Sequence, residues 1–129
     1  TYSDYFPFYE NATVVDIGGH YGYFSLFASL NLHPKSKIFC FEPAKRNFEV
    51  LNLNLKSNKI KNVIAENVGI GGVDGELNLF LGQDSNHSLI NITNKKERIN
   101  VKSLQTILLE NNIQTIDFLK IDCEGAEYE

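Results

Sequence analysis

Short apolar runs alternate with amphipathic stretches along the chain from Ala12 onward. The apolar runs are bounded by glycine, proline or polar residues, which is typical of buried strands. Between them, apolar residues recur at helical spacing, as Ala44, Phe48, Leu51 and Leu55 do. The alternation of the two patterns predicts an α/β protein with a mostly parallel sheet and helices on both of its faces.

Four apolar runs are predicted to be the parallel strands: Thr13 to Ile17, Lys37 to Phe41, Val63 to Asn67 and Ile116 to Ile121. The first predicted helix follows the glycine-rich turn Gly18 to Gly22 and is ended by His33-Pro34. The second predicted helix spans Ala44 to Ser57. A third follows Ser103, whose hydroxyl is expected to cap it, and ends at Asn111-Asn112.

The pattern changes between the third and fourth strands. Asp74-Gly75 is a turn signal. The leucines at 77, 79 and 81 recur with period two, between Glu76, Asn78 and Phe80, and predict an inserted antiparallel β-hairpin. The stretch Gly82 to Lys96 is polar and has no sustained period, so it is predicted to be a surface loop and a candidate lid. A short strand is predicted over Ile99 to Val101.

The composition favours a single domain with few candidate partners. With 129 residues and 43% hydrophobic content, residues 1–129 suit one compact core. The net charge of -4 argues against nucleic acid as a partner. No apolar run reaches the roughly 20 residues of a membrane helix. The start of the chain lacks a signal-peptide pattern, so a cytoplasmic location is expected.

The two cysteines, Cys40 and Cys123, fall in or beside different parallel strands. Strands that flank one common neighbour lie about 9 to 10 Å apart, which exceeds the roughly 7 Å limit for a disulfide. Both cysteines are therefore predicted to be buried free thiols.

The strongest chemical signal is the strand, turn and helix that begin at Val14, with the spacing Asp-x-Gly-x-x-x-Gly. Its two glycines allow a tight turn and a close approach of the backbone to a ligand. A dinucleotide site requires Gly-x-Gly-x-x-Gly, but His20 and Tyr23 stand where that pattern needs glycine. Asp16 repels phosphate and can accept hydrogen bonds from an ammonium group. The turn therefore favours S-adenosylmethionine, which has an ammonium group and no phosphate.

Glu42 follows the second predicted strand directly. A carboxylate at this place can accept hydrogen bonds from both hydroxyls of a ribose. The alternative is that Glu42 only caps the helix that comes after Pro43.

Three acids lie within the first six positions after the fourth predicted strand: Asp122, Glu124 and Glu127. Ligands of open parallel sheets bind beyond the carboxyl ends of strands, so Asp122 and Glu124 are expected to face the donor site. Such acids can orient an acceptor, take its proton or hold a divalent cation. The alternative is a solvated acidic loop at a helix N-terminus. His87, in the polar stretch, is a further candidate for taking the proton.

Three blocks of the sequence together resemble the FkbM methyltransferase family. They are Val14 to Gly18 with Gly22-Tyr23-Phe24-Ser25, then Phe41-Glu42-Pro43 with Asn47-Phe48 and Leu51, then Lys120 to Glu127. The blocks stand in the family's order and at compatible spacing. The resemblance implies a Rossmann-like class I methyltransferase fold, for which we predict the strand order 3-2-1-4. It also implies S-adenosylmethionine as donor and a hydroxyl oxygen of a sugar, polyketide or similar small molecule as acceptor.

The same resemblance implies the site residues. The implied donor ligands are Asp16, Gly18, Gly22 and Glu42, with Asn67 near the adenine. Gly19, His20, Pro43 and Asp122 complete the predicted donor-binding set. Asp122 and Glu124 match the family's acidic block and are the catalytic candidates, and no metal ligand is assigned. His20 stands where the family often has Asn, so it either contacts the donor or faces solvent.

A class I domain continues through further strands, so the sequence is expected to lack C-terminal strands. Either an oligomer or a further segment is then expected to cover the sheet edge. Two other functions fit parts of the pattern. One is a NAD-dependent oxidoreductase built on the same βαβ unit, and the other is a non-catalytic, truncated Rossmann-like binding module.

Overall fold

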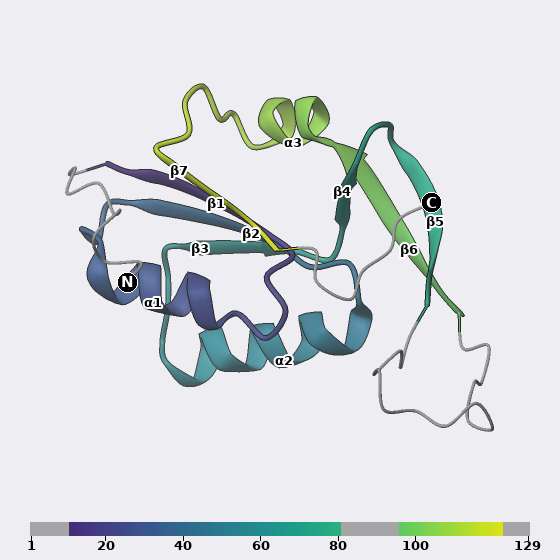
Figure 1. The fold of residues 1–129 in the computed structure, drawn as a ribbon. Helices are drawn as coiled ribbons and strands as arrows, with labels where there is room; N and C mark the ends of the chain where they lie inside the picture. The colour runs from purple at the N-terminus through teal and green to yellow at the C-terminus, as the bar shows by residue number, and fades with distance from the viewer. Residues whose placement is uncertain (1–10, 81–95, 123–129) are drawn as a thin grey trace.

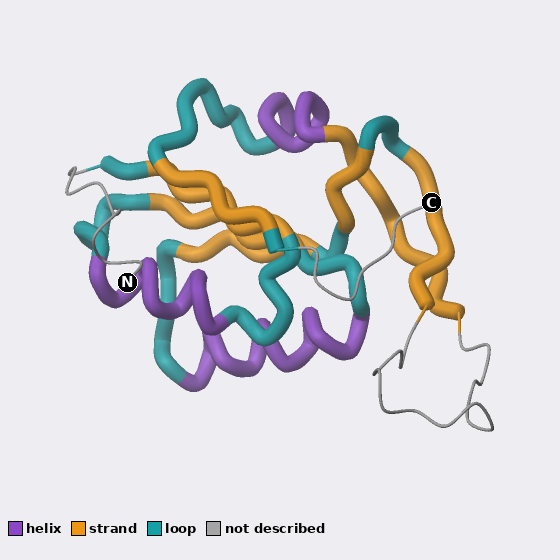
Figure 2. Tube along the Cα trace, viewed as in Figure 1, coloured by secondary structure: helices purple, strands orange, loops and turns teal. Residues whose placement is uncertain are grey.

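The computed structural model describes residues 11–80 and 96–122, shown as a ribbon in Figure 1 and as a tube in Figure 2. Two groups of predictions lie outside these residues. They concern the polar stretch with His87 and the end of the acidic block with Cys123 and Glu124.

Four parallel strands form the larger sheet in the order β3-β2-β1-β7. They are β1 (Thr13–Ile17), β2 (Lys37–Phe41), β3 (Val63–Glu66) and β7 (Phe118–Ile121). The first strand along the chain thus lies inside the sheet, between the second and the fourth strand. This arrangement confirms the predicted order 3-2-1-4.

Helices cover both faces of this sheet. Figure 1 shows α1 (Tyr23–Asn31) and α2 (Lys45–Ser57) on one face and α3 (Leu104–Glu110) on the other. Successive residues of a strand point to opposite faces. Val14 therefore joins the core cluster that contains residues of α1, and Val15 joins the cluster that contains Ile107 of α3. None of the helices in the described residues is long and apolar enough to cross a membrane.

A smaller sheet follows β3, and its strands are β4 (Gly69–Gly71), β5 (Gly75–Phe80) and β6 (Lys96–Ser103). Its order is β4-β6-β5, with β5 and β6 antiparallel. The predicted antiparallel insertion is thereby confirmed. The position of its turn was wrong, because Asp74-Gly75 leads from β4 into β5 and these two strands are not neighbours. Local turn chemistry indicated a reversal, but β6 lies between the two strands and pairs with both.

Asp74 binds the start of α3 instead. Its Oδ1 accepts a hydrogen bond from the N–H of Ser103 at 2.7 Å, and its Oδ2 accepts one from the Thr106 hydroxyl at 2.8 Å. Ser103 is the predicted N-cap, since its Oγ accepts a hydrogen bond from the N–H of Thr106 at 3.1 Å. These bonds attach α3 to the smaller sheet.

Within the described residues, β7 has a neighbouring strand on its β1 side only. Leu119 and Ile121 of β7 are exposed. The predicted cover of this edge, by an oligomer or by a further segment, stays a prediction.

Candidate functional site

The turn after β1 is tied by hydrogen bonds to the ends of both neighbouring strands. The N–H groups of Gly18 and Gly19 donate to the carbonyl of Phe41 at 2.8 and 3.0 Å. On the other side, the N–H of Asp122 donates to the carbonyl of Ile17 at 2.9 Å. The carboxyl ends of β2, β1 and β7 thus bring predicted site residues from three distant segments to one place.

The two glycines predicted to approach a ligand face other parts of the protein. A Cβ atom on Gly18 would lie 1.7 Å from the carbonyl oxygen of Asp122. Gly22 has a φ of 85°, and a Cβ atom there would lie 3.0 Å from Cγ of Leu51. Glycine adopts such a φ without steric cost. Packing within the protein therefore explains both glycines, and their contact with a ligand stays a prediction.

Glu42 turns its carboxylate toward this turn. Its Oε1 accepts a hydrogen bond from the backbone N–H of His20 at 2.8 Å, and its Oε2 accepts one from Ala44 at 2.7 Å. Glu42 is 3% exposed. Burial raises its pKa, and the hydrogen bonds from Ala44 and His20 act to lower it. Glu42 thus caps the segment that enters α2, while each carboxylate oxygen has lone-pair capacity for a second hydrogen bond.

Asn67 holds the backbone that follows Glu42. Its side-chain Nδ2 donates to the carbonyls of Glu42 and Pro43 at 2.8 and 2.9 Å. The amide therefore fixes the path of the chain from β2 toward α2. The predicted place of Asn67 and Pro43 beside a donor stays a prediction.

Asp16 is fully buried at the end of β1. Its Oδ2 accepts hydrogen bonds from the Ser25 hydroxyl at 2.9 Å and from the Cys40 thiol at 3.7 Å. Its Oδ1 lies 3.9 Å from Nζ of Lys120, and no hydrogen bond reaches this atom among the described residues. Burial raises the pKa of Asp16, while the ammonium group of Lys120 acts to lower it. The predicted contact of Asp16 with a donor stays a prediction.

Cys40 and Gly19 pack together beside Asp16. Cys40 is a buried free thiol, as predicted, and burial raises its pKa. A Cβ atom on Gly19 would lie 2.3 Å from Sγ of Cys40. The thiol therefore fills the space against the turn, and Gly19 leaves room for it.

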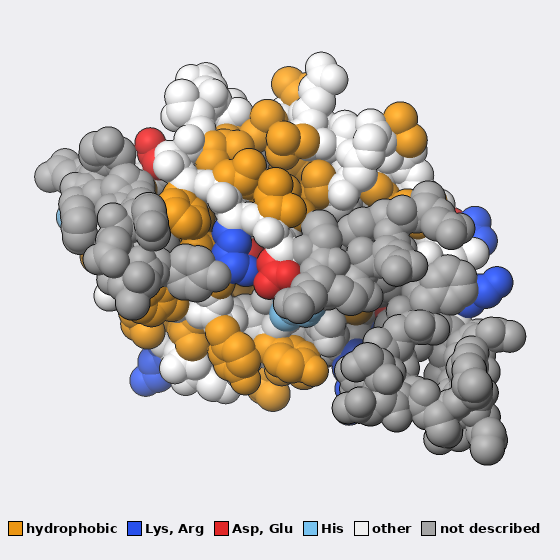
Figure 3. Space-filling model, viewed as in Figure 1, with side chains coloured by type: hydrophobic (Ala, Val, Ile, Leu, Met, Phe, Trp, Pro, Cys, Tyr) orange, Lys and Arg blue, Asp and Glu red, His pale blue; other side chains and the backbone are white. Residues whose placement is uncertain are grey.

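The rim of the site carries a histidine, an acid and a lysine. Nε2 of His20 lies 4.0 Å from Oδ1 of Asp122, whose Oδ2 lies 3.6 Å from Nζ of Lys120. On the face shown in Figure 3, a basic, an acidic and a histidine side chain adjoin, in keeping with these distances. The side chain of His20 is 40% exposed. It therefore both reaches solvent and approaches Asp122, and its contact with a donor stays a prediction.

Lys120 received no role from the sequence, although it is a charged residue inside an apolar run. A charged residue within a predicted buried strand is unusual, and this feature could have identified Lys120 as a candidate site residue. Its contact with Asp16 depends on the register of β1 with β7, which the sequence pattern did not specify. The same holds for Ser25, whose hydroxyl reaches Asp16 from α1.

The arrangement suits the binding of hydroxyl and ammonium groups. Buried carboxylates of Asp16 and Glu42 lie beside a mixed rim of His20, Asp122 and Lys120. Carboxylates accept hydrogen bonds from such groups. In residues 11–80 and 96–122, no group of three or more His, Cys, Asp or Glu side chains could hold a metal ion.

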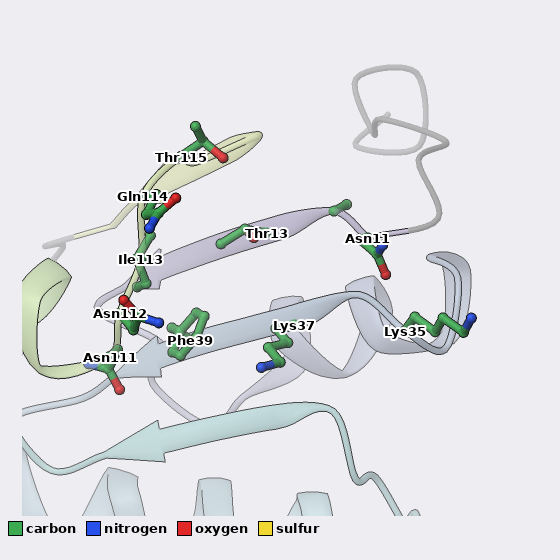
Figure 4. A pocket seen from close by; sticks show the side chains of 11 residues that line it. Asn11, Thr13, Lys35, Lys37, Phe39, Asn111, Asn112, Ile113, Gln114 and Thr115 are labelled. Atoms are coloured by element: carbon green, nitrogen blue, oxygen red, sulfur yellow. The ribbon is translucent and has the colours of Figure 1, made fainter.

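A separate pocket of about 540 Å³ lies at the other end of the strands (Figure 4). Thr13 and Lys37 line it where β1 and β2 begin, and the segment after α3 contributes Asn111 to Thr115. The predicted site residues at the carboxyl ends of the strands are not among its lining residues. This pocket is therefore an alternative place for a ligand, separate from the candidate site.

Comparisons with known proteins identify the family. The family described as Methyltransferase FkbM domain matches residues 16–129. Methyltransferase 1 of Beauveria bassiana (strain ARSEF 2860) is 29% identical over 96% of this chain. Methyltransferase sdnD of Sordaria araneosa is 30% identical over 93% of it. The chain spans 59% of the length of each of these two relatives.

A solved structure shares the fold. The crystal structure of Methyltransferase FkbM from Methylobacillus flagellatus KT has a TM-score of 0.60 and 16% sequence identity to this chain. The match covers 93% of this chain and 28% of that one. It confirms the predicted Rossmann-like fold. Because the family match runs from Asp16 through the last residue, this chain belongs to the FkbM methyltransferase family.

Proposed function

We propose that this chain binds S-adenosylmethionine beside the turn after β1 and transfers its methyl group to a hydroxyl oxygen of a small molecule or sugar. One observation carries the proposal: the buried carboxylate of Glu42 is aimed at the turn by a hydrogen bond from His20. Membership of the FkbM family supports methyl transfer. Since the chain spans 59% of its curated relatives, the activity of the whole protein is part of the proposal.

The residues present fit this donor. Oδ1 of Asp16 is a buried acceptor that receives no hydrogen bond from the described residues. Acids at the ends of β1 and β2 disfavour phosphate and favour ammonium and hydroxyl groups. Glu42 would hold the ribose hydroxyls, Gly19 and His20 would lie along the amino-acid portion, and Asn67 would face the base.

S-adenosylmethionine, when bound, supplies a methyl group on a sulfonium centre. The protein then has to align the acceptor hydroxyl, exclude water and accept the proton that the hydroxyl loses. Asp122 is our candidate for accepting this proton, because its carboxylate lies at the rim of the site and is 35% exposed. Glu124, outside the described residues, is the second candidate.

Calorimetric titration with S-adenosylhomocysteine and with NAD tests the donor. We expect binding of S-adenosylhomocysteine and none of NAD. Binding of NAD alone would establish the oxidoreductase alternative and end the methyltransferase proposal.

Transfer of labelled methyl groups to a panel of hydroxyl compounds tests the reaction. For an acceptor that the wild type methylates, we expect Asp122→Asn to lower kcat, measured at saturating S-adenosylmethionine, by about 100-fold. Asp117→Asn, an acid before β7 rather than after it, is the matched control and should keep kcat. An unchanged kcat in Asp122→Asn removes Asp122 from the reaction. Absence of transfer to every compound, together with absence of donor binding, favours a non-catalytic module.

A further inference from the structure

Lys120 lies in one row of side chains with Asp16 and Cys40. The strand register pairs Asp16 with Cys40 of β2 on one side and with Lys120 of β7 on the other. Neighbouring residues at one register position of a sheet point to the same face. This face is covered by α1, whose Ser25 and Phe24 contact Asp16 and Lys120. The row therefore places a cation beside a buried acid.

The ammonium group of Lys120 is held from three sides. Its Nζ lies 3.9 Å from Oδ1 of Asp16 and 3.6 Å from Oδ2 of Asp122. It also lies 5.1 Å from the ring centroid of Phe24. Two carboxylates and an aromatic face attract a cation, and more strongly where water is partly excluded. With 16% of its side chain exposed, Lys120 is a fixed charge rather than a solvated surface lysine.

Asp16 depends on this charge. Its side chain is fully buried, and no hydrogen bond reaches Oδ1 among the described residues. A buried carboxylate is strongly unfavourable unless an opposite charge or hydrogen bonds compensate it. Lys120 supplies the opposite charge on the side of Oδ1. Only Ile17 separates Asp16 from the turn, so the placement of Asp16 is coupled to the turn.

The orientation of Asp122 also depends on Lys120. The backbone of Asp122 is fixed by its hydrogen bond to Ile17 and by its close approach to Gly18. Its carboxylate lies between Lys120 on one side and His20 on the other. Removal of the Lys120 charge leaves the carboxylate with one less group to hold it beside the turn.

We propose that Lys120 is a positioning residue of the donor site, which joins the buried carboxylate of Asp16 to the rim carboxylate of Asp122 and fixes both acids beside the turn. The inference rests on the proposed function, because it assigns Lys120 to the site of that reaction. Lys120 acts through the two acids. Its loss should therefore weaken donor binding, and restoring a positive charge should restore that binding.

The pH dependence of stability separates this role from simple packing. The titratable groups in the row are Asp16, Cys40 and Lys120, and those that act on it from its surroundings are Asp122, His20 and Glu42. Without Lys120, the pKa of Asp16 rises further above its unfolded value, because burial then acts without the opposing ammonium group. A raised carboxyl pKa gives stability that is complete below the unfolded pKa and is lost as pH rises through the folded pKa. As the pH rises above about 3.9, the free energy of unfolding of Lys120→Met should therefore fall over a wider pH range than that of the wild type.

The experiment compares the wild type with Lys120→Met, Lys120→Arg and the control Lys102→Met. Lys102 also bridges two carboxylates, those of Glu66 and Glu110 at 2.6 Å each, but it belongs to the smaller sheet. S-adenosylhomocysteine is titrated into each protein by calorimetry near neutral pH. Urea unfolding without ligand is then followed from about pH 4 to about pH 8.

We expect Lys120→Met to weaken S-adenosylhomocysteine binding by about tenfold or more. Lys120→Arg should bind within about threefold of the wild type, because the positive charge is kept. Lys102→Met should bind within about twofold, since the acids that Lys102 joins are Glu66 and Glu110 and not Asp16 and Asp122. Addition of Asp16→Asn to Lys120→Met should abolish the extra pH dependence of unfolding. If Lys120→Met is too unstable to purify, this double variant replaces it in the titration and should also bind weakly.

Undiminished binding by Lys120→Met, with the pH profile of the wild type, overturns the role of Lys120 and leaves the proposed function intact. An equal loss of binding in Lys102→Met also overturns it, because the loss then reflects general destabilisation. Failure of the wild type to bind S-adenosylhomocysteine overturns the proposed function, and the role of Lys120 with it.

Discussion

The backbone N–H of His20 donates a hydrogen bond to Oε1 of Glu42 at 2.8 Å, and this bond joins the turn after β1 to the end of β2. The other carboxylate oxygen of Glu42 accepts the N–H of Ala44. One buried side chain thus fixes two turns that belong to different βα units. The shape of the candidate site therefore depends on Glu42 before any ligand arrives.

Replacement of Glu42 by Gln tests this dependence. One carboxylate oxygen becomes an NH₂ group, which cannot accept a hydrogen bond from a backbone N–H. We expect the free energy of unfolding to fall by about 1 to 3 kcal/mol and affinity for S-adenosylhomocysteine to fall by about tenfold. Glu49→Gln, an exposed change on α2, should alter stability by about 0.5 kcal/mol at most. Urea unfolding and calorimetry measure both effects. Lower stability with unchanged affinity for S-adenosylhomocysteine would show that Glu42 only caps the segment before α2 and does not bind the donor.

The change Gly18→Ala should be severe. The new Cβ atom would meet the carbonyl oxygen of Asp122 at 1.7 Å, and the φ of 79° is itself unfavourable for alanine. We expect a loss of about 3 kcal/mol or more in the free energy of unfolding. Gly72→Ala is the matched control, because a Cβ atom there would meet nothing within 4 Å. Similar losses in the two variants would contradict the close contact between the turn and the end of β7.

Removal of the hydroxyl in Ser103→Ala should destabilise the protein by about 1 kcal/mol. Its Oγ accepts a hydrogen bond from the N–H of Thr106 and so satisfies a free donor at the start of α3. Ser57→Ala, at the exposed end of α2, should leave the urea midpoint nearly unchanged. A stability equal to that of the wild type would show that the cap contributes nothing measurable.

Asp74→Asn should change the acid limb of the stability curve. Hydrogen bonds from Ser103 and Thr106 hold the pKa of Asp74 below its usual value. A lowered carboxyl pKa gives stability that is present above the unfolded pKa and is lost as pH falls through the folded pKa. The stability difference between wild type and variant should therefore be complete above about pH 3.9 and shrink below it. A difference that stays constant on acidification would show that the charge of Asp74 has no role.

Local signals in the sequence were sufficient for much of the fold. Ser103 was predicted as an N-cap because a cap contacts residues three positions away. The larger sheet was predicted because its buried strands are separated by amphipathic helices. The position of the hairpin turn was wrong because β5 pairs with β6, which follows the 81–95 segment. No local pattern reveals such a partner.

In the candidate site too, features set by local sequence could be predicted, and features set by contacts between distant segments could not. Glu42 could be predicted to lie near the turn, since both follow parallel strands. The structural reason for glycine at position 18 could not be predicted, because it is the carbonyl of Asp122 that leaves no room for a Cβ atom there. The contact of Lys120 with Asp16 was likewise not predicted, because it is set by the register of β1 with β7.

We propose that the donor binds at the carboxyl ends of β1, β2 and β7. Amide chemical shifts of the ¹⁵N-labelled protein, followed during titration with S-adenosylhomocysteine, test it most directly. We expect the largest saturable shifts at Gly19, His20, Glu42 and Asp122. Saturable shifts centred instead on the pocket at the opposite strand ends, at Thr13 and Asn112, or no shifts at all, would contradict it.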